Sequence, residues 1–244
     1  MKYIITDKQY RILKEQTEQV LKLPSVDYFG GWDGLQKYLA AKNNPLYSIE
    51  GELDLADSNV KSLGNLVSVK GTLHLNGSLI ESLGDLRSVG GDLVLAWTNL
   101  KSLGNLTHIG GNADFAASKL ESLGNLTTVG GNVAAHDSNI KSLGNLTTVG
   151  GDVELFLTKI KSLDNLTTVG GYLTVYSSRL ESLGNLTSVG GYLELGMTNI
   201  ESFGNLKKVG GDLNLGGSHI LLHYRSPKKI RTMVDVGGKV KTKL

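Results

Sequence analysis

With 244 residues, the chain is long enough for one ordinary domain or for one elongated repeat array with caps. Its 25 Lys and Arg nearly balance 23 Asp and Glu, and this balance argues against a histone-like or membrane-coating protein. Cysteine is absent, which excludes a disulfide framework, thiolate zinc sites and a Cys nucleophile. No apolar run approaches the roughly 20 residues that span a bilayer, and the charged N-terminus lacks the apolar core of a signal peptide. We therefore expect a cytoplasmic protein with no membrane association.

Residues 1–50 do not repeat, and their pattern predicts a helical N-terminal cap. Thr6-Asp7-Lys8-Gln9 matches a capping box, which predicts a helix that stops at Pro24. A second helix is predicted from about Asp33 to just before Asn43. Because a solenoid needs its first rung covered, we interpret the region as a cap, with a separate partner-binding element as the alternative. The apolar sides of the two helices would be formed by Tyr10, Leu13, Val20 and Leu21, and by Leu35, Tyr38 and Leu39.

Residues 51–220 repeat with a period of 20 residues, in nine copies without insertion or deletion, the last one truncated. We number each copy from the second Gly of its Gly-Gly pair. Positions 3 and 5 then read Leu-x-Leu, which is typical of a short strand, while the later apolar residues recur every three positions and indicate successive turns of a coil. The sequence therefore predicts a mainly β protein, a parallel β-solenoid of nine rungs. In the copy at 91–110 the inward residues would be Leu93, Leu95, Leu100, Leu103, Leu106 and Ile109.

Two further columns of the repeat predict turns. The Gly-Gly pairs, such as Gly150-Gly151, are expected to supply either a positive φ or a close approach between rungs. Position 8 is Ser or Thr in every copy, and we expect its hydroxyl to turn inward and bond the backbone of the next rung.

The repeat resembles leucine-rich repeats through the run from Leu163 to Leu180, Leu-x-x-Leu-x-x-Val-Gly-Gly-x-Leu-x-Val-x-x-Ser-x-Leu, with Ser or Thr where that family usually has Asn. It is also similar to receptor L domain repeats and to leucine-rich repeat proteins of bacteria and their phages. The resemblance covers residues 51–220 and implies a binding scaffold, built as a curved horseshoe or as a straighter β-helix. A phage origin would imply an inhibitor or adaptor of a host protein, acting in the host cytoplasm.

Residues 221–244 form a basic C-terminal segment, with seven Lys and Arg against Asp235. Alternating apolar residues and Gly237-Gly238 predict a β-hairpin that caps the rod. The alternative is an arm that binds nucleic acid or an acidic partner. The residues of that arm would be Arg225, Lys228, Lys229 and Arg231.

Functional information is expected where the copies differ. Positions 2, 4 and 6 point outward from the predicted strand, and position 7 lies at its exit. Aromatic and apolar residues gather there, mainly over 151–200, and predict a protein-binding face with an acidic rim that includes Asp114, Asp152 and Glu194. The alternative is that these residues pack on one another or against a terminal extension. The candidate partner-binding residues are Trp97, His136, Asp137, Glu154, Phe156, Leu157, Tyr172, Tyr176, Tyr192 and Met197.

Catalytic signals are weak, and we expect no enzyme activity, no cofactor and no metal site. His219 and His223 are four residues apart but lack the Glu of a zinc protease helix. Two other binding functions stay open. Asp137 with Glu154 is the one candidate acid pair for a carbohydrate-binding solenoid, and the pairs of threonines at positions 17 and 18 suggest ice binding, although Arg87, Lys207 and Lys208 interrupt them.

Overall fold

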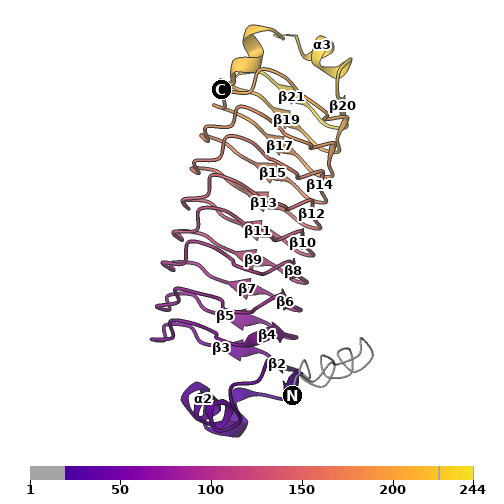
Figure 1. Ribbon diagram of the computed structural model, residues 1–244. Coiled ribbons are helices and arrows are strands. Elements are labelled where there is room, and N and C mark those ends of the chain that lie inside the picture. The colour runs from indigo at the N-terminus through magenta and orange to yellow at the C-terminus, as the bar shows by residue number, and fades with distance from the viewer. Residues whose placement is uncertain (1–19, 225, 244) are drawn as a thin grey trace, which may run out of the picture.

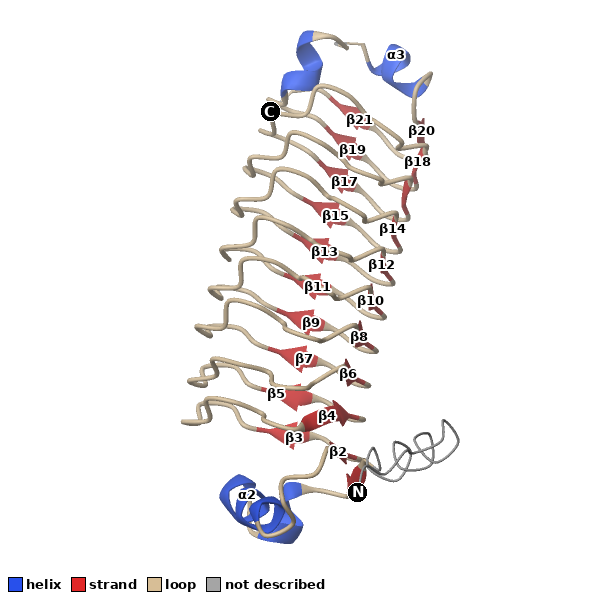
Figure 2. Cartoon of the chain, in the orientation of Figure 1, coloured by secondary structure: helices blue, strands red, loops and turns tan. Residues whose placement is uncertain are grey.

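The computed structural model describes residues 20–224 and 226–243, and it shows a rod of stacked rungs with short helices at both ends (Figure 1). The capping box at 6–9 and the predicted apolar residues Tyr10 and Leu13 lie outside the described residues. Each rung contributes one strand to each of two parallel sheets, on two sides of the coil (Figure 2). The fold is a parallel β-solenoid, as the sequence predicts.

The eleven-stranded sheet contains, in spatial order, β1 (Leu21–Leu23), β2 (Tyr47–Ile49), β4 (Leu66–Val69), β6 (Ser88–Val89), β8 (His108–Ile109), β10 (Thr128–Val129), β12 (Thr148–Val149), β14 (Thr168–Val169), β16 (Ser188–Val189), β18 (Lys208–Val209) and β20 (Asp235–Val236). The ten-stranded sheet contains β3 (Leu53–Asp54), β5 (Leu73–His74), β7 (Leu93–Val94), β9 (Ala113–Asp114), β11 (Val133–Ala134), β13 (Val153–Glu154), β15 (Leu173–Thr174), β17 (Leu193–Glu194), β19 (Leu213–Asn214) and β21 (Val240–Lys241).

The register is constant along the rod, so residues 20 apart lie one above another. Ala113 pairs with Leu93 on one side and with Val133 on the other. Parallel bridges between Ser residues at position 12, such as Ser102 with Ser122, form a third ladder. The rod runs straight and does not form a curved horseshoe (Figure 1). In the copy at 91–110 all six predicted inward residues are at most 1% exposed.

The eleven-stranded sheet was not predicted as a sheet. Apart from β4, its strands in the repeat occupy positions 18 and 19, where only position 19 is an apolar column, so the segment lacks the alternation that Leu-x-Leu gives the other sheet. The first Gly of each pair follows these strands and turns the chain toward the other sheet. A Cβ at Gly130 would lie 2.1 Å from the carbonyl oxygen of Gly110, so the pair serves close approach between rungs.

Position 8 is buried from the second copy on, as expected, but its hydrogen bond differs from the prediction. The Ser138 hydroxyl donates to the carbonyl of Ala135, and Thr158 does the same to Leu155 at 2.6 Å. The acceptor belongs to the same rung and not to the next one. The hydroxyl therefore satisfies a buried carbonyl at the turn that follows the strand.

The N-terminal cap contains one of the two predicted helices within the described residues. Helix α2 (Trp32–Ala40) buries Leu35 and Leu39 against the first rungs, and a 3-10 turn, η1 (Val26–Phe29), precedes it. The prediction of a helix through Val20 and Leu21 is wrong, because Leu21–Leu23 is strand β1 and pairs with β2. Pairing with an open sheet edge outweighs local helical spacing at this point.

The C-terminal segment adds a further rung, and the prediction of a hairpin at Gly237-Gly238 is wrong. Strand β20 continues one sheet and β21 continues the other, each parallel to the strand before it. Gly237-Gly238 is a corner of the same kind as the repeat pairs, since a Cβ at Gly237 would lie 2.3 Å from the Gly210 carbonyl oxygen. The 3-10 turn η2 (His219–Leu222) and helix α3 (Pro227–Arg231) fill the connection.

Candidate interaction face

The outer face of the ten-stranded sheet, with the turn residues at position 7, carries most of the variation between copies. We call it the variable face; it comprises positions 2, 4, 6 and 7 of the nine copies. These positions hold no Lys or Arg in any copy, although the whole chain has a net charge of +2. Negative charge is therefore segregated onto this side of the rod. Its acidic residues are Glu52, Asp54, Asp57, Asp92, Asp114, Asp137, Asp152, Glu154, Glu194 and Asp212.

Position 7 has a left-handed backbone in every copy. Gly77 and Gly217 adopt φ values of 66° and 71°, as expected for glycine. Trp97, Leu157 and Met197 adopt φ values of 58°, 58° and 55° in the same column. A bulky side chain in this conformation is uncommon and costs free energy. The sequence analysis did not predict this strain, although the glycines of the column were a signal for it.

The same three side chains are exposed. Trp97 is 73% exposed, Leu157 56% and Met197 47%. Leu157 and Met197 follow β13 and β17, whereas Trp97 follows β7, three rungs of 20 residues before Leu157. The structure thus places Trp97 apart from the other apolar residues of the face. A strained position that holds an exposed apolar side chain points to selection for function.

Two pairs of aromatic rings stack along the rod. His136 and Phe156, at position 6 of consecutive rungs, have ring centroids 4.7 Å apart and planes inclined by 2°. Tyr172 and Tyr192, at position 2, are 4.7 Å apart and inclined by 5°. Tyr176 lies against the next rung, where a Cβ at Gly196 would be 3.2 Å from its Cδ2 atom. Four of the ten predicted partner-binding residues therefore form stacked ring pairs, and Tyr176 lies close to the backbone of the next rung.

Glu154 joins the two stacked pairs. Its carboxylate accepts a short hydrogen bond from the Tyr172 hydroxyl, and it lies 3.9 Å from Nε2 of His136. Nδ1 of His136 lies 3.2 Å from the Asp137 carboxylate. The predicted pair Asp137 and Glu154 thus flanks one imidazole. We call Glu154 and the four stacked rings of His136, Phe156, Tyr172 and Tyr192 the aromatic cluster.

The tyrosines of the aromatic cluster lie in a negative environment. The hydrogen bond to Glu154 raises the pKa of Tyr172, and burial and the charges of Glu154 and Asp152 raise it further. Burial, followed by the carboxylates of Glu154, Asp152 and Glu194, raises the pKa of Tyr192. Both hydroxyls therefore stay protonated at neutral pH and can donate hydrogen bonds.

Some polar residues of the face support the rungs. At position 2, side-chain oxygens accept the backbone N–H of the next rung, as Asn132 does from Asp152 and Asp152 does from Tyr172, each at 2.8 Å. At position 4, Asp114 accepts the N–H of Ala116 at 3.0 Å. Asn and Asp perform the bonding at position 2 equally well, so the charge of Asp152 is not needed for it.

The basic C-terminal residues are largely engaged in the terminal rung. The Arg231 guanidinium donates to the carbonyls of Val236 and Gly238, and Lys229 lies 5.2 Å from the centroid of the Tyr224 ring. Lys228 is exposed on α3, and Arg225 lies outside the described residues. The described part of this segment is built into the fold as a cap.

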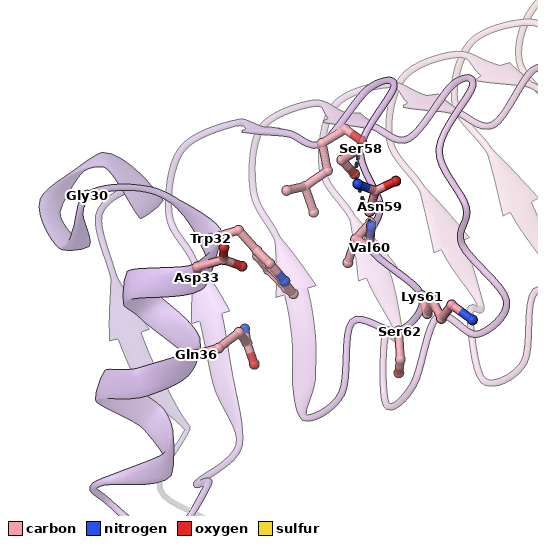
Figure 3. A pocket seen from close by; sticks show the side chains of 10 residues that line it. Gly30, Trp32, Asp33, Gln36, Ser58, Asn59, Val60, Lys61 and Ser62 are labelled. Atoms are coloured by element: carbon pink, nitrogen blue, oxygen red, sulfur yellow. Dashed lines mark hydrogen bonds between the residues drawn. The ribbon is translucent and has the colours of Figure 1, made fainter.

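A pocket of about 600 Å³ separates the N-terminal cap from the first rung (Figure 3). Trp32, Asp33 and Gln36 of α2 face it from one side, and the segment 58–62 faces it from the other. The sequence analysis did not predict this pocket. It arises because α2 covers only part of the end of the rod, and Val60 is less buried than its equivalents in later copies.

The threonines at position 17 are also structural. The Thr127 hydroxyl donates to the carbonyl of Thr107, and Thr147 and Thr167 repeat the bond at 3.0 and 2.8 Å. These hydroxyls connect rungs, and each uses its one proton within the rod. Position 18 shows a further interruption, because His108 bonds Thr128 at 2.6 Å.

Comparison with known proteins adds no relative. No protein-family model matches the chain, and no curated protein matches its sequence. Of the residues that the model describes, no helix has the length and apolar character needed to cross a membrane.

Proposed function

We propose that the protein is a non-enzymatic interaction module whose rigid rod presents the variable face to a protein partner. The observation that carries the proposal is the set of exposed Trp97, Leu157 and Met197, held at a backbone position that favours glycine. Large exposed apolar and aromatic residues are the usual anchors of protein interfaces. The core needs none of these side chains.

The rod is suited to this role because its face is preorganised. Each rung is fixed by parallel pairing to both neighbours, so a partner loses little free energy in ordering the face. The resemblance to leucine-rich repeats, whose members mostly serve as binding scaffolds, supports the same function. We extend the proposal to an inhibitor or adaptor that acts on a host protein in the cytoplasm, by analogy with bacterial and phage repeat proteins.

The other binding functions have less support. A sugar stacks on the face of an aromatic ring, and in the aromatic cluster the stacked neighbour already covers one of the two faces of each ring. Nucleic-acid binding would rest on the C-terminal basic residues, and Arg231 there is occupied by two backbone carbonyls. An acidic variable face also repels phosphates.

The test is quantitative affinity capture from the native host, followed by direct binding to the purified captured protein. The variant Trp97→Gly/Leu157→Gly/Met197→Gly removes the three exposed side chains and places glycine, which favours the left-handed backbone, at position 7. The matched control is Leu79→Asn/Leu222→Ser, which removes two exposed apolar side chains from other parts of the surface. We expect a partner that binds wild type and control equally and loses at least about tenfold in affinity for the triple variant. Equal binding by all three proteins would refute the proposal.

A further inference from the structure

We infer that the partner contacts the variable face with a segment rich in Lys or Arg, whose cations lie beside Asp152 and Glu154 while neighbouring apolar groups meet Leu157 and the aromatic cluster. The inference rests on the proposed function and specifies the chemistry of its partner. It is carried by charge segregation and by the way in which the chain itself fills one such position.

The charge of the face lacks compensation from the repeat. Salt bridges elsewhere on the rod join the two signs along position 11, as between Lys141 and Glu121 at 2.7 Å and between Lys161 and Glu181 at 3.0 Å. The variable face has no equivalent, since none of its repeat positions holds Lys or Arg. Repulsion among its carboxylates is a cost that a cationic partner would remove on binding.

The C-terminal rung shows how a cation fits this face. Within the described residues, the Lys that pairs with an acid of the variable face is Lys241, on β21, which lies 3.0 Å from the Asp212 carboxylate. The backbone N–H of Lys239 also bonds that carboxylate. Lys241 thus places one ammonium beside an acidic rung, while Val240 packs inward on the core. A partner segment that brings cations to the acids further along the face would form the same kind of ion pair.

Glu154 is the best placed acid for such a contact. Its side chain is 31% exposed, and its carboxylate contacts one ring of each stacked pair, the Tyr172 hydroxyl and Nε2 of His136 at 3.9 Å. An ion pair in such a partly desolvated position is stronger than one on an open surface. The next acids at position 4 toward the two ends are Asp114 and Glu194, which lie two rungs away on either side and thus about 19 Å apart, given a strand spacing near 4.8 Å. An extended segment of about six residues covers that length.

The experiment uses the full chain and defined probes. Two labelled 12-residue peptides, one of alternating Arg and Leu and one of alternating Glu and Leu, are titrated at 50 and 200 mM NaCl. The face variant is Asp114→Asn/Asp152→Asn/Glu154→Gln, which keeps the oxygens that accept the structural hydrogen bonds. The control variant, Glu81→Gln/Glu121→Gln/Glu181→Gln, removes the same charge from position 11.

We expect wild type and control to bind the Arg peptide about tenfold more tightly than the face variant does, with a preference over the Glu peptide that weakens at the higher salt concentration. Equal binding of the Arg peptide by the face and control variants would overturn the inference. If that result came with loss of the captured partner in the position 7 variant, the interaction module would stand and only its cationic partner would be rejected. Tighter binding of the Glu peptide than of the Arg peptide by wild type would also overturn the inference of a cationic partner segment.

Discussion

Replacing Trp97 by Gly separates a functional from a structural role for position 7. Trp97 is 73% exposed, so about a quarter of a side chain of roughly 250 Å² is buried, which is worth about 1.5 kcal/mol. Glycine adds about 0.5–1 kcal/mol of unfolded-state entropy, and release from the left-handed conformation returns about 1–2 kcal/mol. These contributions largely offset one another, and we expect the free energy of unfolding to fall by no more than about 1.5 kcal/mol.

The assay is urea unfolding followed by circular dichroism, since fluorescence would change with the removed indole. The comparison variant is Leu155→Ala, which truncates a fully buried side chain at position 5. We expect its free energy of unfolding to fall by about 2–5 kcal/mol. Because a repeat array can unfold in more than one step, the complete curves of both variants are compared with wild type. A loss for Trp97→Gly as large as that for Leu155→Ala would refute the argument that Trp97 is dispensable for folding.

Two further predictions concern the rungs. Gly130→Ala should destabilise the protein by about 2 kcal/mol or more, because its Cβ would overlap the Gly110 carbonyl oxygen. Gly124→Ala meets no atom within 4 Å and should cost only about 1 kcal/mol of backbone strain. Equal thermal midpoints of the two variants would contradict this prediction. The N–H of Lys239 and the Lys241 ammonium lower the pKa of Asp212, so this carboxylate stabilises the last rung above its unfolded pKa of about 3.9 and less as pH falls through the lowered value. Asp212→Asn should therefore flatten the acid limb of the unfolding curve below about pH 4, and an unchanged limb would exclude this contribution.

Much of the fold of the rod could be predicted from the sequence, because the constant period of 20 residues determines which residues stack. An unbroken period of 20 residues requires that Leu93, Ala113 and Val133 form a column, and they do. The strands at positions 18 and 19 were not predicted because this segment has one apolar column, position 19, and lacks the alternation of positions 3 and 5. Strand β1 was misassigned because its pairing partner, β2, lies 26 residues further along the chain, at Tyr47 for Leu21.

The additional rung at the C-terminus carried a signal that was not used. Val236-Gly237-Gly238-Lys239-Val240 has the same pattern as Val209-Gly210-Gly211-Asp212-Leu213, but 27 residues later instead of 20. The seven extra residues lie in the connection that contains η2 and α3 and displace the pattern from the repeat register. A search for the corner motif alone, without its period, would have found it.

In the candidate site, contacts between residues at the same repeat position could be predicted, but contacts between different positions could not. His136 and Phe156 share position 6, so their stacking follows from the period. The contact of Glu154 with Tyr172 links positions 4 and 2 of neighbouring rungs, and it depends on the rotamers of both side chains, which no periodicity supplies. The left-handed backbone at Trp97 was hidden by the side chain itself, since Trp is not a residue from which such a conformation is inferred.

Because the rungs stack in a constant order in both sheets, distances along the rod are multiples of one rung spacing. Removing residues 111–130 would bring Trp97 one rung, or about 4.8 Å, closer to Leu157, and every remaining strand could still pair in the same register. Duplicating the same 20 residues would move the two side chains apart by an equal step. The distance between contact points on this protein is thus a quantity that changes by gain or loss of units, independently of the chemistry at each point.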